Sequence, residues 1–329
     1  MSSLENLIIA AIVLASPLCL AYLWRWDILR PGSLTRLGAA GRLRNPARVH
    51  SAAWLAACIA TLLAASVGAA LTASALGVAP PVGEGPAPAI EPHTAALAEL
   101  GAYCLAIVVG ILCAALLART GRLSGGEHGA ADARSLGLFE RGGAWRDALR
   151  GLGGLLLVLP LCLTVGIALS QVATALGGDP PRVGHSALRE MVDRRHEWHA
   201  WLRAGLAILG APVVEELMYR VFLQSAIISG LARLRAIRVR ANGAGVGGGG
   251  SDTATAGDAF WGIALSSAAF VLPHAAALSG PASWNALPSL AILGVGLGVV
   301  YERTRSPIAP IVMHMGFNAL NVAAALATA

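Results

Sequence analysis

The chain of 329 residues is 56% hydrophobic, and charged residues make up only 13% of it. A soluble domain usually carries about 25% charged residues, because water must wet its surface. The composition therefore excludes an ordinary soluble globule and indicates a protein whose solvent is a lipid bilayer. The net charge of +6 does not indicate a nucleic-acid partner, because all 24 basic residues are arginines and most lie between apolar segments, as topology signals do.

Apolar segments follow one another along the whole chain. A membrane-spanning helix needs about 20 mostly apolar residues, and about eight segments reach or approach this length. They are residues 5–24, 52–77, 97–118, 151–176, 203–232, 259–279, 287–302 and 307–328. The sequence therefore predicts an all-α fold, a polytopic transmembrane helical bundle. The first segment is expected to be a retained span, because it lacks the preceding basic region and the clear cleavage site of a signal peptide.

The arginines alternate between loops. Most of the 24 follow the first, third, fifth and seventh spans, whereas the loops on the other side have few, diluted by acidic residues. The positive-inside rule makes the arginine-rich side cytoplasmic and places both termini outside. An arginine-only, alanine- and glycine-rich sequence is typical of a GC-rich bacterial genome, so we expect a multi-pass protein of the bacterial cell (inner) membrane.

Between the fourth and fifth spans, residues 185–202 mix charges with tryptophan and leucine. This pattern predicts an amphipathic helix that lies on the membrane surface. Its histidines, His185, His196 and His199, could in principle bind a metal, but their exposed and charged surroundings favour a solvated surface.

The fifth span carries three charged residues near its middle. Within APVVEELMYRVFLQ, Glu215, Glu216 and Arg220 fall in six residues. One charge at the bilayer centre costs about 2.5–3.5 kcal/mol even on a lenient scale, so these must face one another or a water-filled cavity. Glu216 and Arg220 are four residues apart and share a helix face, which predicts a buried ion pair. Glu215 is rotated by about 100° from Glu216 and is left as the free carboxylate, which suits a general base.

The sixth and eighth spans contain polar residues at similar spacing. In FVLPH, Phe270 and His274 are four apart, and in HMGFN, His314 and Asn318 are four apart. Residues at this spacing lie on one helix face. A lone histidine in a membrane helix more often hydrogen-bonds a neighbouring helix, but two histidines, an asparagine and two glutamates on three helices favour a shared reactive site. Mutual neutralisation without any reaction is the structural alternative.

These groups are the ones that hydrolysis of an amide by water requires. A carboxylate can take a proton from water, a histidine can position that water or protonate the leaving amine, and an asparagine amide with a histidine N–H can stabilise the oxyanion. No cofactor is needed. A divalent metal such as zinc, held by Glu215, His274 and His314, is the alternative. The sequence contains no HExxH motif, so the zincin pattern is absent.

Three motifs occur in order, each on a predicted span. They are Glu215-Glu216-x-x-x-Arg220, Phe270-x-x-x-His274 and His314-x-x-x-Asn318. Together they resemble the signature of the CPBP family, which contains the type II CAAX prenyl endopeptidases and the bacterial Abi proteins. The resemblance covers residues from about 200 to 329. We therefore divide the chain into N-terminal helices and loops at 1–200, with about four spans, and a CPBP-like core at 201–329, with about four more.

The resemblance implies an intramembrane endopeptidase with a glutamate-activated water. Glu215 would be the base, and Glu216 and Arg220 would support the site electrostatically. His274 would help to bind the water, whereas His314 and Asn318 would form the oxyanion hole. The family is also named as metalloproteases, and the residues permit either chemistry; the metal-free reading is preferred.

The expected substrate is a membrane-anchored protein or peptide that reaches the site from the lipid bilayer. The family includes members that cut prenylated proteins and bacterial members linked to bacteriocin maturation or immunity, and the bacterial character of the sequence argues against a prenylated substrate. The alternative function is that of a non-enzymatic membrane protein, such as a proton-coupled transporter or a bacteriocin-immunity factor, because intramembrane carboxylates and histidines also build proton relays.

Overall fold

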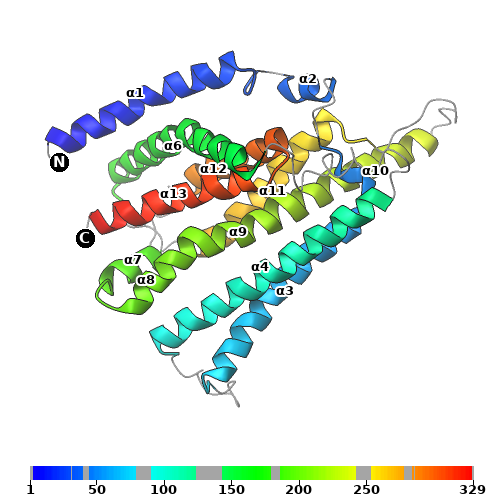
Figure 1. Cartoon of the computed structure of the whole chain (residues 1–329). Helices are drawn as coiled ribbons and strands as arrows, with labels where there is room; N and C mark the ends of the chain where they lie inside the picture. Colours follow the sequence, from blue (N-terminus) through cyan, green and yellow to red (C-terminus); the bar gives the residue numbers. More distant parts are fainter. Residues whose placement is uncertain are drawn as a thin grey trace.

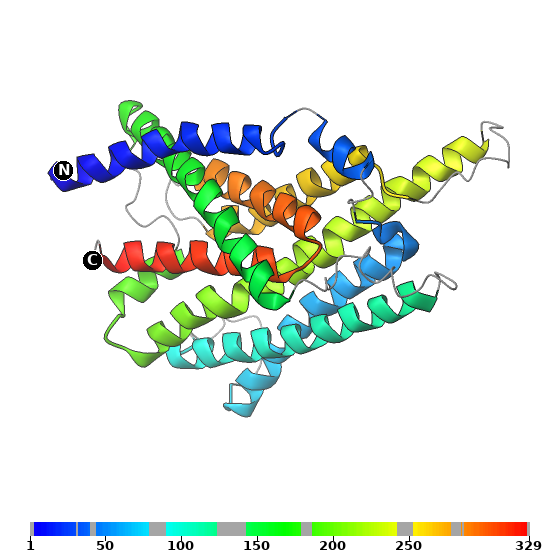
Figure 2. The same ribbon diagram turned by 45° about the horizontal axis from the view of Figure 1, so that its top comes forward.

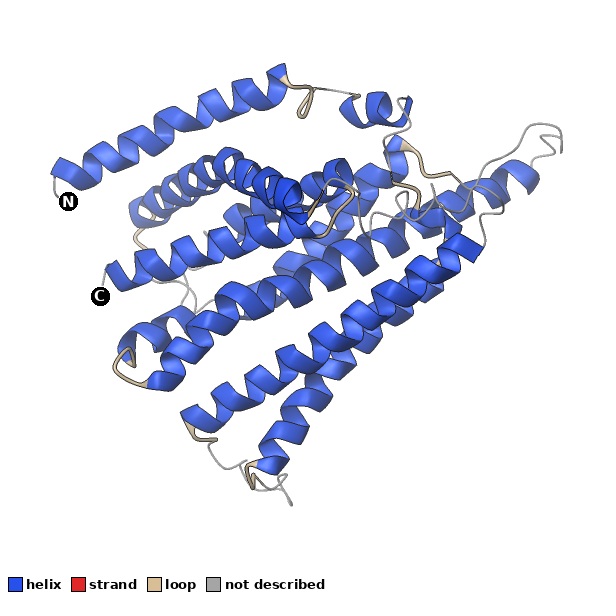
Figure 3. Cartoon of the chain, in the orientation of Figure 1, coloured by secondary structure: helices blue, strands red, loops and turns tan. Residues whose placement is uncertain are grey.

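The computed structural model describes residues 3–30, 32–39, 44–78, 90–123, 143–178, 186–241, 253–277, 284 and 286–327. Within these ranges the regular structure is helical and no strand occurs (Figure 3). The predicted all-α fold is confirmed. His185 and the residues around position 80 lie outside the described ranges.

Six helices of the described chain are long and apolar enough to cross a membrane. They are α3 (Ser51–Ala75), α4 (Pro92–Leu123), α6 (Ala144–Ala175), α11 (Ala256–Ala277), α12 (Ala286–Thr304) and α13 (Ile308–Ala327). Each overlaps one of the predicted spans. The predicted first span corresponds to helix α1 (Ser3–Arg25). Its apolar part, Ile9–Arg25, is shorter than the six candidate spans. It is followed by the short helix α2 (Ser33–Ala39).

The predicted fifth span is the centre of a longer helical run that changes its winding twice. The run consists of α8 (Trp198–Gly205), the π-helical segment η3 (Leu206–Gly210), α9 (Ala211–Glu216), the π-helical segment η4 (Leu217–Gln224) and α10 (Ser225–Ala241). It extends beyond the predicted 203–232 at both ends. A hydropathy pattern does not show this change of winding, because it depends on which residues are apolar and not on which backbone groups form hydrogen bonds.

The helices pack as a bundle around this run. The hairpin of α3 and α4 lies along one side, and α11, α12 and α13 lie on the other, with α6 crossing α12 and α13 (Figures 1 and 2). Helix α1 lies beside α6, where the Ser16 hydroxyl is 2.9 Å from the carbonyl oxygen of Pro160. Both termini lie at the end of the bundle that carries α7 (Ser186–Asp193) and α8, and α2 lies at the opposite end.

The interior contains clusters of buried side chains contributed by both halves of the chain. One cluster joins Trp54 of α3 and Leu117 of α4 to Phe222 of η4 and Tyr301 of α12. Large apolar side chains are instead common on the outer surfaces, as expected where lipid is the solvent. The boundary at residue 200 stays a prediction about where the motif-bearing region begins, since the helices before and after it pack together.

Candidate active site

The two adjacent glutamates lie at the junction between α9 and η4, so π-helical winding flanks them on both sides. π-Helical turns are rare and are frequently found at functional sites. The site residues Glu215 and Glu216 therefore stand on a short α-helical segment between two irregular ones.

Pro212 and Asn318 explain the first of these irregular segments. In η3 the N–H of Ala211 donates to the carbonyl of Leu206, five residues earlier. In the same register the carbonyl of Ala207 would be paired with residue 212, which is a proline and has no N–H. The Asn318 amide from α13 supplies the missing donor, with Nδ2 2.8 Å from the Ala207 oxygen. Neighbouring side chains commonly satisfy such freed carbonyls in membrane helices.

Glu216 is completely buried and is held from two directions. Its Oε2 atom is 3.3 Å from Nε of Arg220, the ion pair that the four-residue spacing predicts. Its Oε1 atom is 3.0 Å from Nδ1 of His314 on α13. The carboxylate therefore links the helical run to α13 and balances the charge of the buried Arg220.

Glu215 has different surroundings from its neighbour. About a quarter of its side chain (26%) is accessible, and its Oε2 atom lies 3.8 Å from Nε2 of His314, beyond hydrogen-bond distance. That oxygen has no hydrogen-bond partner in the described part of the chain. Glu215 is thus the less constrained of the two carboxylates.

The hydrogen bonds of the two histidines assign their ring protons. His314 Nδ1 faces a carboxylate oxygen of Glu216, and His274 Nδ1 is 2.7 Å from the carbonyl oxygen of Phe270. Carbonyl oxygens and ionised carboxylates only accept hydrogen bonds, so in each ring Nδ1 must carry the proton. In the neutral form, Nε2 of each histidine is then an acceptor.

The ring of Phe270 separates the charged groups of the site. Its centroid is 4.7 Å from that of His274 and 5.6 Å from that of His314. The Arg220 guanidinium carbon is 5.3 Å from the same ring, and Tyr219 meets it edge-on at 5.6 Å. The aromatic residue of the second motif is therefore a packing centre onto which the arginine and both histidines dock.

Of the predicted site residues, the structure brings Glu215, Glu216, Arg220 and His314 into direct contact or near contact. His274 adjoins them through Phe270. Asn318 instead binds the Ala207 carbonyl, so one of its two amide hydrogens is already used.

Sequence reasoning missed the serines that hold Arg220. Its Nη1 atom lies 3.2 Å from the hydroxyl of Ser266 and 3.4 Å from that of Ser267, both on α11. The spacing of Ser267, Phe270 and His274 at i, i+3 and i+7 places them on one face of α11, and this pattern could have revealed the serine.

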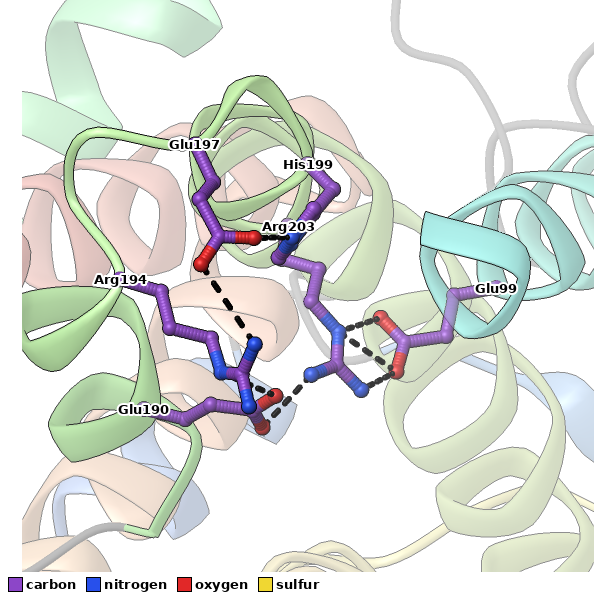
Figure 4. Close-up of polar contacts among 6 residues, drawn as sticks. All are labelled: Glu99, Glu190, Arg194, Glu197, His199 and Arg203. Atoms are coloured by element: carbon purple, nitrogen blue, oxygen red, sulfur yellow. Dashed lines mark hydrogen bonds and ion pairs between the residues drawn. The ribbon is translucent and has the colours of Figure 1, made fainter. Parts of the chain in front are cut away.

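A network of charged residues lies near the start of the helical run (Figure 4). Its members are Glu99, Glu190, Arg194, Glu197, His199 and Arg203. Arg203 of α8 lies 3.1 Å from Glu99 of α4 through Nε and 2.7 Å from Glu190 of α7 through Nη1. These contacts tie the beginning of the run to two other helices.

The sequence predicts one amphipathic helix at residues 185–202, but in the structure this segment does not form a single helix. It forms α7 and the first residues of α8, separated by a turn. The apolar sides of both short helices pack against Val322 of α13 through Met191 and Ala200. The sequence predicts an exposed His199, but this residue is buried in the first turn of α8, where it contacts Glu197. The helix is interrupted where several charged residues follow one another, and the hydrophobic pattern alone does not show this break.

The predicted metal alternative needs Glu215, His274 and His314 to meet at one point. Both histidines direct Nδ1 to an acceptor, which is how proteins orient imidazoles that ligate through Nε2. Glu215 adds a carboxylate near His314. Among the described residues, however, no three histidine, cysteine or carboxylate side chains lie close enough together to hold a metal ion.

Comparison with known proteins adds one finding. Residues 197–320 match the family model described as type II CAAX prenyl endopeptidase Rce1-like, and all the site residues of the three motifs fall inside this range. Among curated proteins and solved structures, none matches the chain. The chain is therefore an integral membrane protein whose residues 197–320 are similar to the Rce1-like type II CAAX prenyl endopeptidases.

Proposed function

We propose that this protein is an intramembrane endopeptidase that hydrolyses a peptide bond of a membrane-associated protein or peptide, with Glu215 as the base that activates water. The observation that carries the proposal is the contrast between two adjacent carboxylates inside an Rce1-like domain. Glu216 is buried and paired, whereas Glu215 is partly accessible and lies near the oriented imidazole of His314.

In the proposed reaction Glu215 accepts a proton from water while the water oxygen bonds to the carbonyl carbon of the substrate. The carbonyl oxygen then bears the negative charge. The proton held by Glu215 passes to the amide nitrogen as the carbon–nitrogen bond breaks, which leaves an acid and an amine and returns Glu215 to its carboxylate. His274 fits the role of water holder, because its Nε2 atom is an acceptor when the ring is neutral.

His314 is suited to oxyanion stabilisation only when its ring is doubly protonated. Its Nδ1 proton already faces Glu216, so a donor at Nε2 needs the imidazolium form. Asn318 can contribute its second amide hydrogen while the first remains on Ala207.

Zinc is the alternative to this metal-free proposal. Glu215, His274 and His314 are the residues that would hold it, although in the described structure they do not form a group of three donors around one point. Elemental analysis of the purified protein, with activity measured after chelation, separates the two cases. Stoichiometric zinc that is lost together with activity would replace the metal-free mechanism.

The test is cleavage of a membrane-anchored reporter peptide by purified protein in proteoliposomes. Glu215→Gln keeps the shape of the side chain but removes the base, and should lower the rate by about 10²–10⁴-fold. Glu91→Gln is the matched control, because Glu91 is largely exposed and lies before α4, so it should keep the wild-type rate.

Full activity in Glu215→Ala, His274→Ala and His314→Ala alike would show the assignment to be wrong. Proton-coupled flux that is lost in Glu215→Gln, without any detectable proteolysis by the wild-type protein, would favour a transporter instead.

A further inference from the structure

A second buried ion pair lies outside the three motifs. Nε and Nη2 of Arg44 are 3.0 and 2.6 Å from one oxygen of Glu302, near the end of α12. Both side chains are almost inaccessible, at 0% and 1%, and the guanidinium stacks 4.0 Å above the ring of Tyr301. Burying two charges is expensive, and such a pair is weak evidence of added stability. Its presence therefore calls for another explanation.

Polar contacts connect this pair to Arg220 in the site. Gln224 of η4 donates from Nε2 to the same Glu302 oxygen, at 2.9 Å. The hydroxyl of Ser266 lies 3.2 Å from Oε1 of Gln224, and Nη1 of Arg220 lies 3.2 Å from that hydroxyl. We call Arg44, Glu302, Gln224 and Ser266 the arginine relay.

The chemistry of the partners sets the direction of every hydrogen bond in the relay. The carboxylate of Glu302 only accepts, so the amide nitrogen of Gln224 must face it and the amide oxygen must face Ser266. Arg220 only donates, so Ser266 accepts from it. Ser266 shares its own proton between the amide oxygen of Gln224 and the carbonyl of Ile263, each 3.2 Å away. Donation thus runs in one direction from Arg220 to Glu302, and hydrogen bonds aligned in this way polarise one another.

The four-residue spacing along the helical run makes this alignment possible, and the winding of η4 supports it. Glu216, Arg220 and Gln224 are spaced four residues apart, and the wider π-helical turn brings such residues closer to one line along the helix than an α-helix does. One end of the row faces His314, and the other faces Glu302.

The Arg220 guanidinium depends on few contacts. Its bond to Glu216 is 3.3 Å long, those to Ser266 and Ser267 are 3.2 and 3.4 Å, and its Nη2 atom has no hydrogen-bond partner among the described residues. With so few contacts, the position of the Arg220 guanidinium depends on whether the Ser266 hydroxyl is itself fixed by Gln224. We infer that the arginine relay positions Arg220, and through it Glu216 and His314, for the reaction.

Arg44, Glu302, Gln224 and Ser266 are therefore positioning residues, and Arg44 extends the working assembly to a segment outside the family match at 197–320. This inference rests on the proposed peptidase function.

The experiment measures kcat and KM on the reporter peptide for two relay variants and one control. Gln224→Met removes the link between Glu302 and Ser266 without leaving a charge unpaired, because Arg44 still neutralises Glu302. Ser266 also keeps an acceptor, since the Ile263 carbonyl is 3.2 Å from its hydroxyl. Ser266→Ala breaks the next link. Ser229→Ala is the matched control, because Ser229 is equally buried but binds the Val49 carbonyl outside the relay.

Gln224→Met and Ser266→Ala should each lower kcat by about tenfold and change KM by less than about twofold, because the relay acts on orientation and not on substrate binding. The double variant should lose about as much as the stronger single variant, since both break one chain. Ser229→Ala should keep the wild-type kcat although it removes a buried hydroxyl of the same kind.

Three outcomes would overturn the inference. The first is a wild-type kcat in folded Ser266→Ala. This small substitution should be tolerated by the helix, so it keeps the test decisive even if Gln224→Met does not fold. The second is an equal loss in Ser229→Ala, which would indicate general destabilisation. The third is a wild-type rate no higher than that of Glu215→Ala, which would remove the proposed function and this inference with it. In the first two outcomes the wild-type enzyme still cleaves, so only the relay fails.

Discussion

Glu215 and Glu216 are chemically identical neighbours that the fold treats in opposite ways. A rotation of about 100° along the helix directs one into a fully buried pair with Arg220 and His314 and leaves the other partly accessible. The difference lies in their partners, and it makes the two residues separable by experiment.

Substituting each glutamate with glutamine should therefore give different results. Glu216→Gln leaves the Arg220 charge buried without its carboxylate, which should lower the free energy of unfolding by about 3–5 kcal/mol. Glu215→Gln removes no ion pair within hydrogen-bond distance, so the folded protein should keep its thermal midpoint while it loses activity. Thermal unfolding in detergent, measured beside reporter cleavage, checks both. An equal drop in stability in the two variants would contradict the distinction.

At the scale of the element, the long run from Trp198 to Ala241 shows how a proline can be useful inside a membrane helix. Pro212 leaves the Ala207 carbonyl without its π-register donor, and Asn318 supplies one from another helix. The asparagine of the third motif thus has a structural partner as well as its proposed place beside the oxyanion.

A double-mutant cycle separates these two roles of Asn318. Asn318→Ala should cost about 1–3 kcal/mol of stability, because it leaves a carbonyl unpaired. Pro212→Ala restores a backbone N–H at position 212, so Asn318→Ala should cost less in that background. Thermal unfolding measures the stability, and reporter cleavage measures the rate. If Asn318 also stabilises the oxyanion, the double variant should be more stable than Asn318→Ala alone but should not recover kcat. Identical stability losses from Asn318→Ala in both backgrounds would exclude the capping role.

At the scale of the whole molecule, the alternation of arginines predicts which end of the bundle faces which compartment. Both termini lie at the end with α7 and α8, as an even number of crossings requires (Figures 1 and 2). From the positive-inside rule we expect that end to be extracytoplasmic.

Cysteine labelling in intact cells tests this orientation. In a variant without the native cysteines, Glu91→Cys before α4 should react with a membrane-impermeant thiol reagent. Arg238→Cys, exposed near the end of α10, should react only after the membrane is opened. The reverse pattern would show that the protein is inserted the other way round.

Much of this architecture could be predicted from the sequence, because hydropathy and length decide where spans lie, and helical spacing decides which polar residues share a face. The pairing of Glu216 with Arg220 belongs to this class. The two π-helical segments do not, since winding depends on hydrogen-bond register. The contact between Arg44 and Glu302 joins residues 258 positions apart, and only the tertiary packing brings them together.

The charges of the helical run also bear on how the protein is made. At about 2.5–3.5 kcal/mol for each central charge, a segment with Glu215, Glu216 and Arg220 is a poor candidate for transfer into lipid by itself. The partners that lower this cost, His314 and Ser266, are synthesised later, on α13 and α11. Stable integration of this helix into the bilayer must therefore await the C-terminal helices, so that membrane insertion and assembly of the site become a single step of biogenesis.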